Sequence, residues 1–157
     1  SHAKSTAKFP VVSISDYCSQ HKIQKIDFLK TDIEEYDYFA LLGGGDLLYS
    51  IKFVQFELGV GAPFNDRYVE ALDYFELMCG KFSFYIVKDE NHPLWKSGFI
   101  SCDIVSVGRD FFVSDVANGF GGFGYNILAV NDCVDISMFN FDIGCFSEDY
   151  YAEILKN

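Results

Sequence analysis

The sequence predicts an α/β protein in which strands and helices alternate along a doubly wound sheet. Residues 26–31 and 51–57 are nearly continuous apolar runs of strand length, a pattern typical of strands covered on both faces. The first run is followed at once by a helical pattern and the second after a short loop, and strands that alternate with helices pair in parallel through right-handed crossovers. The 157 residues fit a single domain, 1–157, of which residues 1–2 look like the scar of a cleaved tag.

The first elements are expected to be a short helix, a strand and a second helix. Ser15 is expected to be the N-cap of the short helix, which runs to Gln20. After the strand over 26–31, the second helix has acids in its first turn, which complement the positive end of a helix. The three glycines at 43–45 are expected to end this helix. A glycine-rich phosphate loop is the other interpretation, but such a loop should open a helix rather than close one.

The second strand, 51–57, ends on Glu57 and leads into a Gly-Pro loop. A helix is expected over 64–80 because apolar residues recur at helical spacing and Gly80 provides a stop. A third strand is expected over 81–89.

The C-terminal part is expected to be irregular and rich in β-structure, with strands at 99–108 and 125–130 and a terminal helix capped by Ser147. His92 is a general-base candidate, although a solvated loop histidine is the commoner interpretation. The glycine-rich loop 118–126 either covers a bound small molecule or packs its rings on the domain, the rings being Phe120, Phe123 and Tyr125.

Composition excludes several classes of function. The formal net charge of −11 argues against binding to nucleic acid and to anionic membranes, because both need clustered Lys and Arg. No apolar run approaches the roughly 20 residues of a membrane span, and no signal peptide is visible. The five cysteines are odd in number and widely spaced, which predicts reduced thiols in a cytoplasmic protein without a metal site.

Carboxylates follow the predicted strands where each strand ends. Asp32 and Glu34 follow the first strand, and Glu57 ends the second. In a parallel sheet these ends meet at one edge, where ligands of such sheets bind. Asp32 and Glu34 could instead serve only as first-turn acids of a helix, worth a few tenths up to ~1 kcal/mol.

The stretch "IDFLKTDIEEYDYFALLGGGDLL" resembles the central block of FkbM-type S-adenosylmethionine-dependent methyltransferases, in which a strand ending in K-x-D-x-E-G opens a helix. Lys30, Asp32 and Glu34 match that motif, and Gly43 matches a later Leu-x-Gly turn. "IKFVQFELG" looks like the family's next strand, "VVSISDYCSQHKIQKID" is similar to its leader, and "YNILAVN" resembles a late strand.

The resemblance implies a Rossmann-like methyltransferase sheet that uses S-adenosylmethionine and methylates a hydroxyl of a sugar or small metabolite. It implies catalytic roles for Asp32, Glu34 and Glu57, and cofactor-binding roles for Lys30 and Asp32. A carboxylate near a sulfonium is favourable electrostatics, and a carboxylate can accept the proton of an acceptor hydroxyl.

The sequence departs from the family pattern at two places. Glu35 stands where the family usually has glycine, so a close approach of ligand to backbone is not expected there. The glycine-rich first loop of the family has no counterpart before Val11. The chain is therefore expected to resemble the C-terminal half of the domain, with its later strands only, and to bind the cofactor weakly or not at all by itself.

Two alternatives to a methyltransferase remain open from the sequence. The first is a non-catalytic half-domain that binds a partner or regulates one, and the second is an unrelated α/β domain. The expected partners are a small-molecule acceptor and either a second copy or a complementary N-terminal half, because the strand over 26–31 would otherwise keep one unpaired edge.

Overall fold

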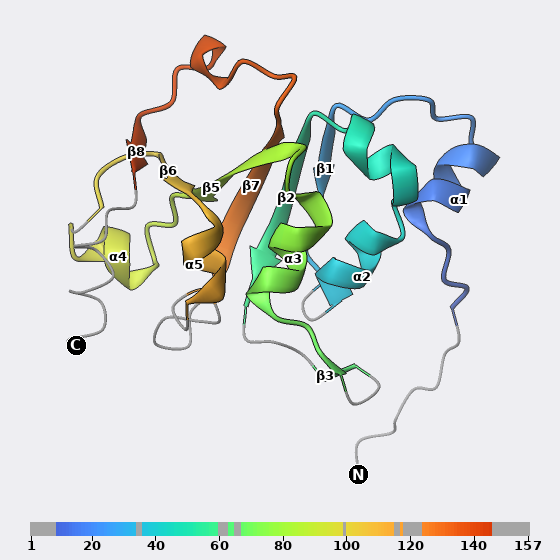
Figure 1. Cartoon of the computed structure of the whole chain (residues 1–157), viewed down its shortest axis with the longest axis horizontal. Helices are drawn as coiled ribbons and strands as arrows, with labels where there is room; N and C mark the ends of the chain where they lie inside the picture. The colour runs from blue at the N-terminus through green and yellow to red at the C-terminus, as the bar shows by residue number, and fades with distance from the viewer. Residues whose placement is uncertain are drawn as a thin grey trace.

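The computed structural model describes residues 9–33, 36–59, 63–64, 67–98, 100–114, 117 and 124–145 (Figure 1). The helices are α1 (Ile14–Gln20), α2 (Asp37–Leu42), α3 (Ala71–Met78), α4 (Pro93–Lys96) and α5 (Arg109–Val113), with 3-10 turns η2 (Gly45–Ser50) and η3 (Ile136–Met138). The strands are β1 (Phe28–Lys30), β2 (Phe53–Leu58), β3 (Pro63–Phe64), β4 (Arg67–Tyr68), β5 (Phe82–Val87), β6 (Ile104–Val107), β7 (Tyr125–Asn131) and β8 (Ile143–Cys145).

Six strands form one mixed sheet in the order β1-β2-β7-β5-β6-β8. β1 and β2 pair in parallel, as the alternation of strands and helices predicts. β7 pairs antiparallel with both β2 and β5, so β5 runs in the same direction as β1 and β2 without touching them. β3 and β4 form a separate two-stranded ribbon.

The prediction of a parallel sheet is therefore correct for β1 and β2 and wrong for the sheet as a whole. β7 is buried at all but one of its seven positions, and such a strand needs neighbours on both sides. β7 lies between β2 and β5, so both of its neighbours come from segments far away in the sequence.

One face of the sheet is covered by α2, α3 and α5, which lie in front of it in Figure 1. Val54, Phe56 and Leu58 of β2 point to this face and are at most 1% exposed, and the Phe56 ring stacks on Tyr74 of α3 with 4.9 Å between centroids. The alternate β2 residues are half-buried. β2 is thus fully covered on one face only among the described residues, not on both as its apolar run predicts.

Several predicted element boundaries shift in the structure. Ser13 rather than Ser15 caps α1, because its hydroxyl accepts the Asp16 N–H. The helix expected over 64–80 starts only at Ala71, where Glu70 and Asp73 form a reciprocal capping box. The glycines end α2 as predicted: Gly43 donates its N–H to Phe39 and Leu41 carbonyls. The predicted terminal helix after Ser147 lies outside the described residues.

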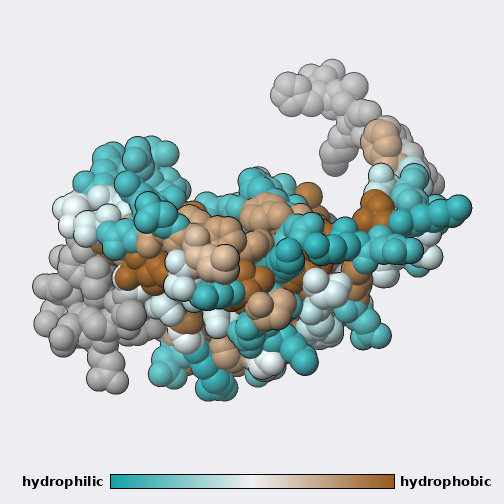
Figure 2. Space-filling model, turned by 90° about the horizontal axis from the view of Figure 1, so that it is seen from above, coloured by the Kyte–Doolittle hydropathy of each residue, from teal (hydrophilic) through white to brown (hydrophobic). Residues whose placement is uncertain are grey.

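Large apolar side chains remain exposed at both ends of the sheet. Seen from above, the molecule shows apolar surface among hydrophilic areas (Figure 2). Phe28 of β1 and Ile143 of β8 are exposed on the two edge strands. Val11, Val12, Ile33 and Tyr36 are exposed as well, as are Met138, Phe139 and Phe141, and the Phe139 ring lies 5.4 Å from that of Phe53 in β2.

Candidate functional site

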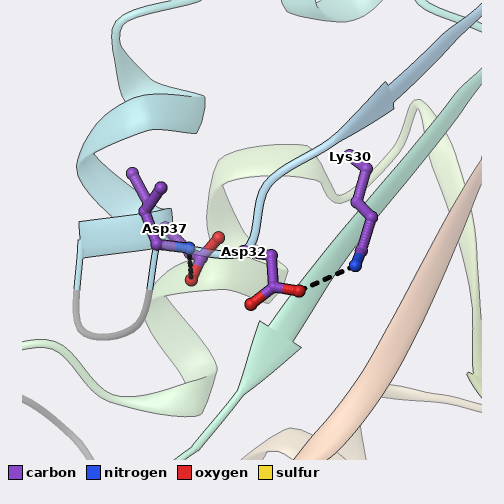
Figure 3. A network of polar contacts seen from close by, with 4 residues as sticks. Lys30, Asp32 and Asp37 are labelled. Carbon is purple, nitrogen blue, oxygen red and sulfur yellow. Dashed lines mark hydrogen bonds and ion pairs between the residues drawn. The ribbon is translucent and has the colours of Figure 1, made fainter.

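A lysine and a carboxylate meet where β1 ends. Lys30 Nζ donates a hydrogen bond of 2.7 Å to Asp32 Oδ2, and the two side chains point toward one another (Figure 3). The two side chains are 47% and 55% exposed. This hydrogen bond, followed by the negative charge of Asp32, raises the pKa of Lys30. The two charges are exposed and therefore accessible to a ligand. Because an exposed ion pair contributes little to stability, a ligand that replaces it would hardly lower the stability of the fold.

Glu57 joins this pair from the neighbouring strand. It is half-buried near the carboxyl end of β2, on the face of the sheet that also carries Lys30 and Gln55, which are register partners. The negative charge of Glu57 also raises the pKa of Lys30, though less than Asp32 does. The structure thus brings Lys30, Asp32 and Glu57 to one edge, as the sequence predicts, whereas Glu34 lies outside the described residues.

Asp37 is a carboxylate to which the sequence assigns no role of its own. It is fully buried in the first turn of α2, and its Oδ2 accepts the Ile33 N–H at 3.3 Å (Figure 3). This contact ties the loop after Asp32 to the start of the helix. The sequence offers only its place in the first turn of the predicted helix, because its burial depends on how α2 packs.

Thr31, between Lys30 and Asp32, is also buried, with 7% of its surface exposed. Its hydroxyl has no hydrogen-bond partner among the described residues. Buried hydroxyls in folded proteins are nearly always hydrogen-bonded to protein, water or ligand. The Thr31 hydroxyl is therefore a polar group at the end of β1 that a water molecule or a ligand could bind.

An apolar groove lies beside the loop that follows Asp32. Its volume is about 560 Å³, and Ile33 and Tyr36, which lie just beyond Asp32 in the chain, form one wall. The segment before α1 forms another wall and is held near α2 by the bond from the Ser15 N–H to the Gly43 carbonyl, 3.1 Å long. The groove could not be predicted from the sequence, because it needs two segments that meet only in the fold; its lining residues include Val11, Val12, Phe39 and Ala40.

The charged edge carries two carboxylates and one ammonium, whereas the groove is lined by none of Lys30, Asp32 and Glu57. Asp32 and Glu57 together exceed the single positive charge of Lys30, so the edge keeps negative charge for a cation.

His92 does not lie in solvent, and that interpretation of the sequence is wrong. It is 1% exposed, its Nδ1 accepts the Leu94 N–H at 3.3 Å, and its ring lies 4.8 Å from that of Tyr125. Burial lowers the pKa of His92, against a smaller opposite effect of Asp89. Tyr125 is buried too and packs on Phe111, which favours packing rather than a lid, whereas Phe120 and Phe123 lie outside the described residues.

The part of the chain that the structure describes contains no helix with the length and hydropathy of a membrane span. It also contains no group of three or more His, Cys, Asp or Glu side chains placed to hold a metal ion. The cysteines described there are free thiols: Cys18, Cys79, Cys102 and Cys133.

The family model of the methyltransferase FkbM domain matches residues 1–83, which is more than half of the 157 residues. The matched part contains β1, β2, α2 and α3, and therefore Lys30, Asp32 and Glu57. No curated protein and no solved structure gives a significant match. The chain belongs to the FkbM methyltransferase domain family.

Proposed function

We propose that this chain is a domain of an S-adenosylmethionine-dependent methyltransferase, acting on a hydroxyl of a sugar or another small metabolite in the cytoplasm. The observation that carries the proposal is the convergence of Lys30, Asp32 and Glu57 at one sheet edge, inside the part matched by the family model. The free thiols of the described cysteines are consistent with a reducing compartment.

The carboxylates have two tasks in this proposal. Asp32 and Glu57 would hold the cationic end of the cofactor, which would supply the methyl group, and the charge of Lys30 offsets the repulsion between the two carboxylates. Either carboxylate can accept the proton that the acceptor hydroxyl loses during transfer.

The remaining contribution is positioning. Asp37 holds the loop after Asp32 through the Ile33 N–H, so the Asp32 carboxylate keeps its place beside Lys30. The groove next to Ile33 and Tyr36 offers apolar surface to the flat part of a ligand and excludes water from it. Orientation of this kind supplies much of the rate of a group transfer between two bound molecules.

Calorimetric titration of the purified chain with S-adenosylhomocysteine tests the proposal. We expect binding with a dissociation constant above ~10 µM, about −7 kcal/mol or weaker, because the described residues that line the groove include no charged side chain. No heat of binding up to ~1 mM, about −4.1 kcal/mol, would contradict it.

We further propose that β1 pairs with a second copy of the chain. The Asp27 carbonyl and the Thr31 N–H bind β2, so in the alternating pattern of a strand the N–H and C=O of Phe28 and Lys30 point away from the sheet. A complementary N-terminal half is the other occupant of this edge. Light scattering is expected to give twice 17.8 kDa, and a monomer of 17.8 kDa at micromolar concentration would contradict the dimer.

A further inference from the structure

The start of β7 reaches the same edge as the ends of β1 and β2. In the antiparallel pairing of β2 with β7, Leu58 lies opposite Tyr125, and Glu57 lies opposite Asn126. Gly124 comes directly before Tyr125, so it enters the sheet beside the last residues of β2.

The Glu57 carboxylate takes up the space that a side chain at position 124 would need. A Cβ added to Gly124 would lie 2.9 Å from Glu57 Oε1 and 3.1 Å from the Leu58 carbonyl oxygen. The Leu58 oxygen belongs to a paired strand and cannot move away easily, so the Glu57 side chain would have to shift instead.

Backbone conformation does not explain the glycine at this position. Among the described glycines, positive φ angles occur at Gly45, Gly80 and Gly98, and Gly124 is not one of them. An alanine at position 124 would therefore fit the backbone and conflict only with its neighbours. Gly59, directly after β2, is different, because a Cβ there would meet no atom within 4 Å.

The place of the Glu57 carboxylate matters for the charges at this edge. Glu57 lies close enough to Lys30 for its charge to act on that ammonium, and it is half-buried, so its side chain has restricted freedom. A carboxylate displaced from Gly124 would change its separation from Lys30, and with it the negative charge presented to a cationic ligand group.

We propose that Gly124 is a positioning residue of the candidate site: by having no side chain, it sets where the Glu57 carboxylate lies. This inference rests on the proposed function for its consequence in ligand binding, and on the contact itself for the placement of Glu57. Position 124 lies outside the part matched by the family model, so the match does not assign it a role.

The experiment compares Gly124→Ala with Gly59→Ala, a matched change at the same edge in open space. Gly124→Ala is expected to weaken S-adenosylhomocysteine binding about tenfold, equal to ~1.4 kcal/mol, and Gly59→Ala by less than about twofold. Glu57→Asp shortens the side chain by one methylene and so moves the carboxylate away from position 124. In that background the effect of Gly124→Ala should fall below about threefold, a non-additivity expected only if Gly124 acts through Glu57.

A second readout needs no ligand. The titration of the Glu57 side-chain carboxyl, followed by carbon NMR, is expected to shift by about half a pH unit or more in Gly124→Ala and to stay unchanged in Gly59→Ala. If the unaltered chain binds no S-adenosylhomocysteine but this shift occurs, the proposed function fails and the placement of Glu57 by Gly124 stands.

Two results would overturn the inference. The first is a Glu57 titration in Gly124→Ala that matches the unaltered chain. The second is an equal loss of binding from Gly124→Ala whether position 57 is Glu or Asp, which would assign the loss to something other than Glu57.

Discussion

The two ends of β1 carry the same kinds of side chain but differ in how their charges are balanced. At the amino end, Asp27 Oδ1 lies 2.9 Å from the Nζ atoms of both Lys25 and Lys52. At the carboxyl end, Lys30 Nζ lies 2.7 Å from Asp32, and Glu57 acts on the same ammonium. Two cations therefore surround one carboxylate at the first end, whereas one cation faces two carboxylates at the second.

The pKa shifts follow this difference. Hydrogen bonds from Lys52 and then Lys25 lower the pKa of Asp27, and the hydrogen bond to Asp32 raises the pKa of Lys30. The amino end has no negative charge left for a ligand, while the carboxyl end has. At the carboxyl end, the neighbouring strand β2 brings a second carboxylate, and the apolar groove begins at Ile33, directly after Asp32. These features make the carboxyl end the candidate site.

The largest effect should come from the buried carboxylate behind the carboxyl end. Asp37→Ala is expected to lower the free energy of unfolding by about 2 kcal/mol, because the Ile33 N–H loses its acceptor and the first turn of α2 loses a favourable charge. Chemical denaturation measures this loss. Asp27→Ala is the control and should leave the denaturation midpoint unchanged; similar losses in the two variants would mean that burial of Asp37 does not matter.

The next effect concerns His92, whose ring packs on Tyr125 at the start of β7. Its pKa is lowered in the folded state, so between the ordinary value of about 6.5 and the lowered value the unfolded chain binds the proton and the folded chain does not. The free energy of unfolding should therefore be greatest above pH ~6.5 and fall as the pH drops below it, by up to ~1.4 kcal/mol per pH unit.

His92→Asn retains a side-chain acceptor for the Leu94 N–H and removes the titrating group. We expect its unfolding free energy to depend less on pH between about 5.5 and 6.5 than that of the unaltered chain. The exposed His21 is the control, and His21→Asn should keep the full pH dependence. If both variants retain it, another group causes the acid destabilisation.

The local parts of this edge could be predicted from the sequence. Strands next to Asp32 and Glu57 follow from apolar runs, and a parallel pair brings their ends together. The position of β7 could not be predicted, because strand pairing joins residues far apart in the chain, and the contact of Gly124 with Glu57 follows from it. Burial of Asp37 and His92 was missed for a related reason: polar residues look exposed until the elements around them are packed.

The most direct measurement titrates S-adenosylhomocysteine into Asp32→Asn and Asp27→Asn side by side. Both changes remove one negative charge from an exposed, lysine-paired carboxylate at an end of β1. We expect binding to depend on the carboxyl end of β1 and not on the amino end. Asp32→Asn should therefore weaken binding about tenfold or more, ~1.4 kcal/mol, and Asp27→Asn by less than about twofold. Equal losses, or no loss in either variant, would contradict the placement of the site and leave Asp32 with no role beyond the helix start.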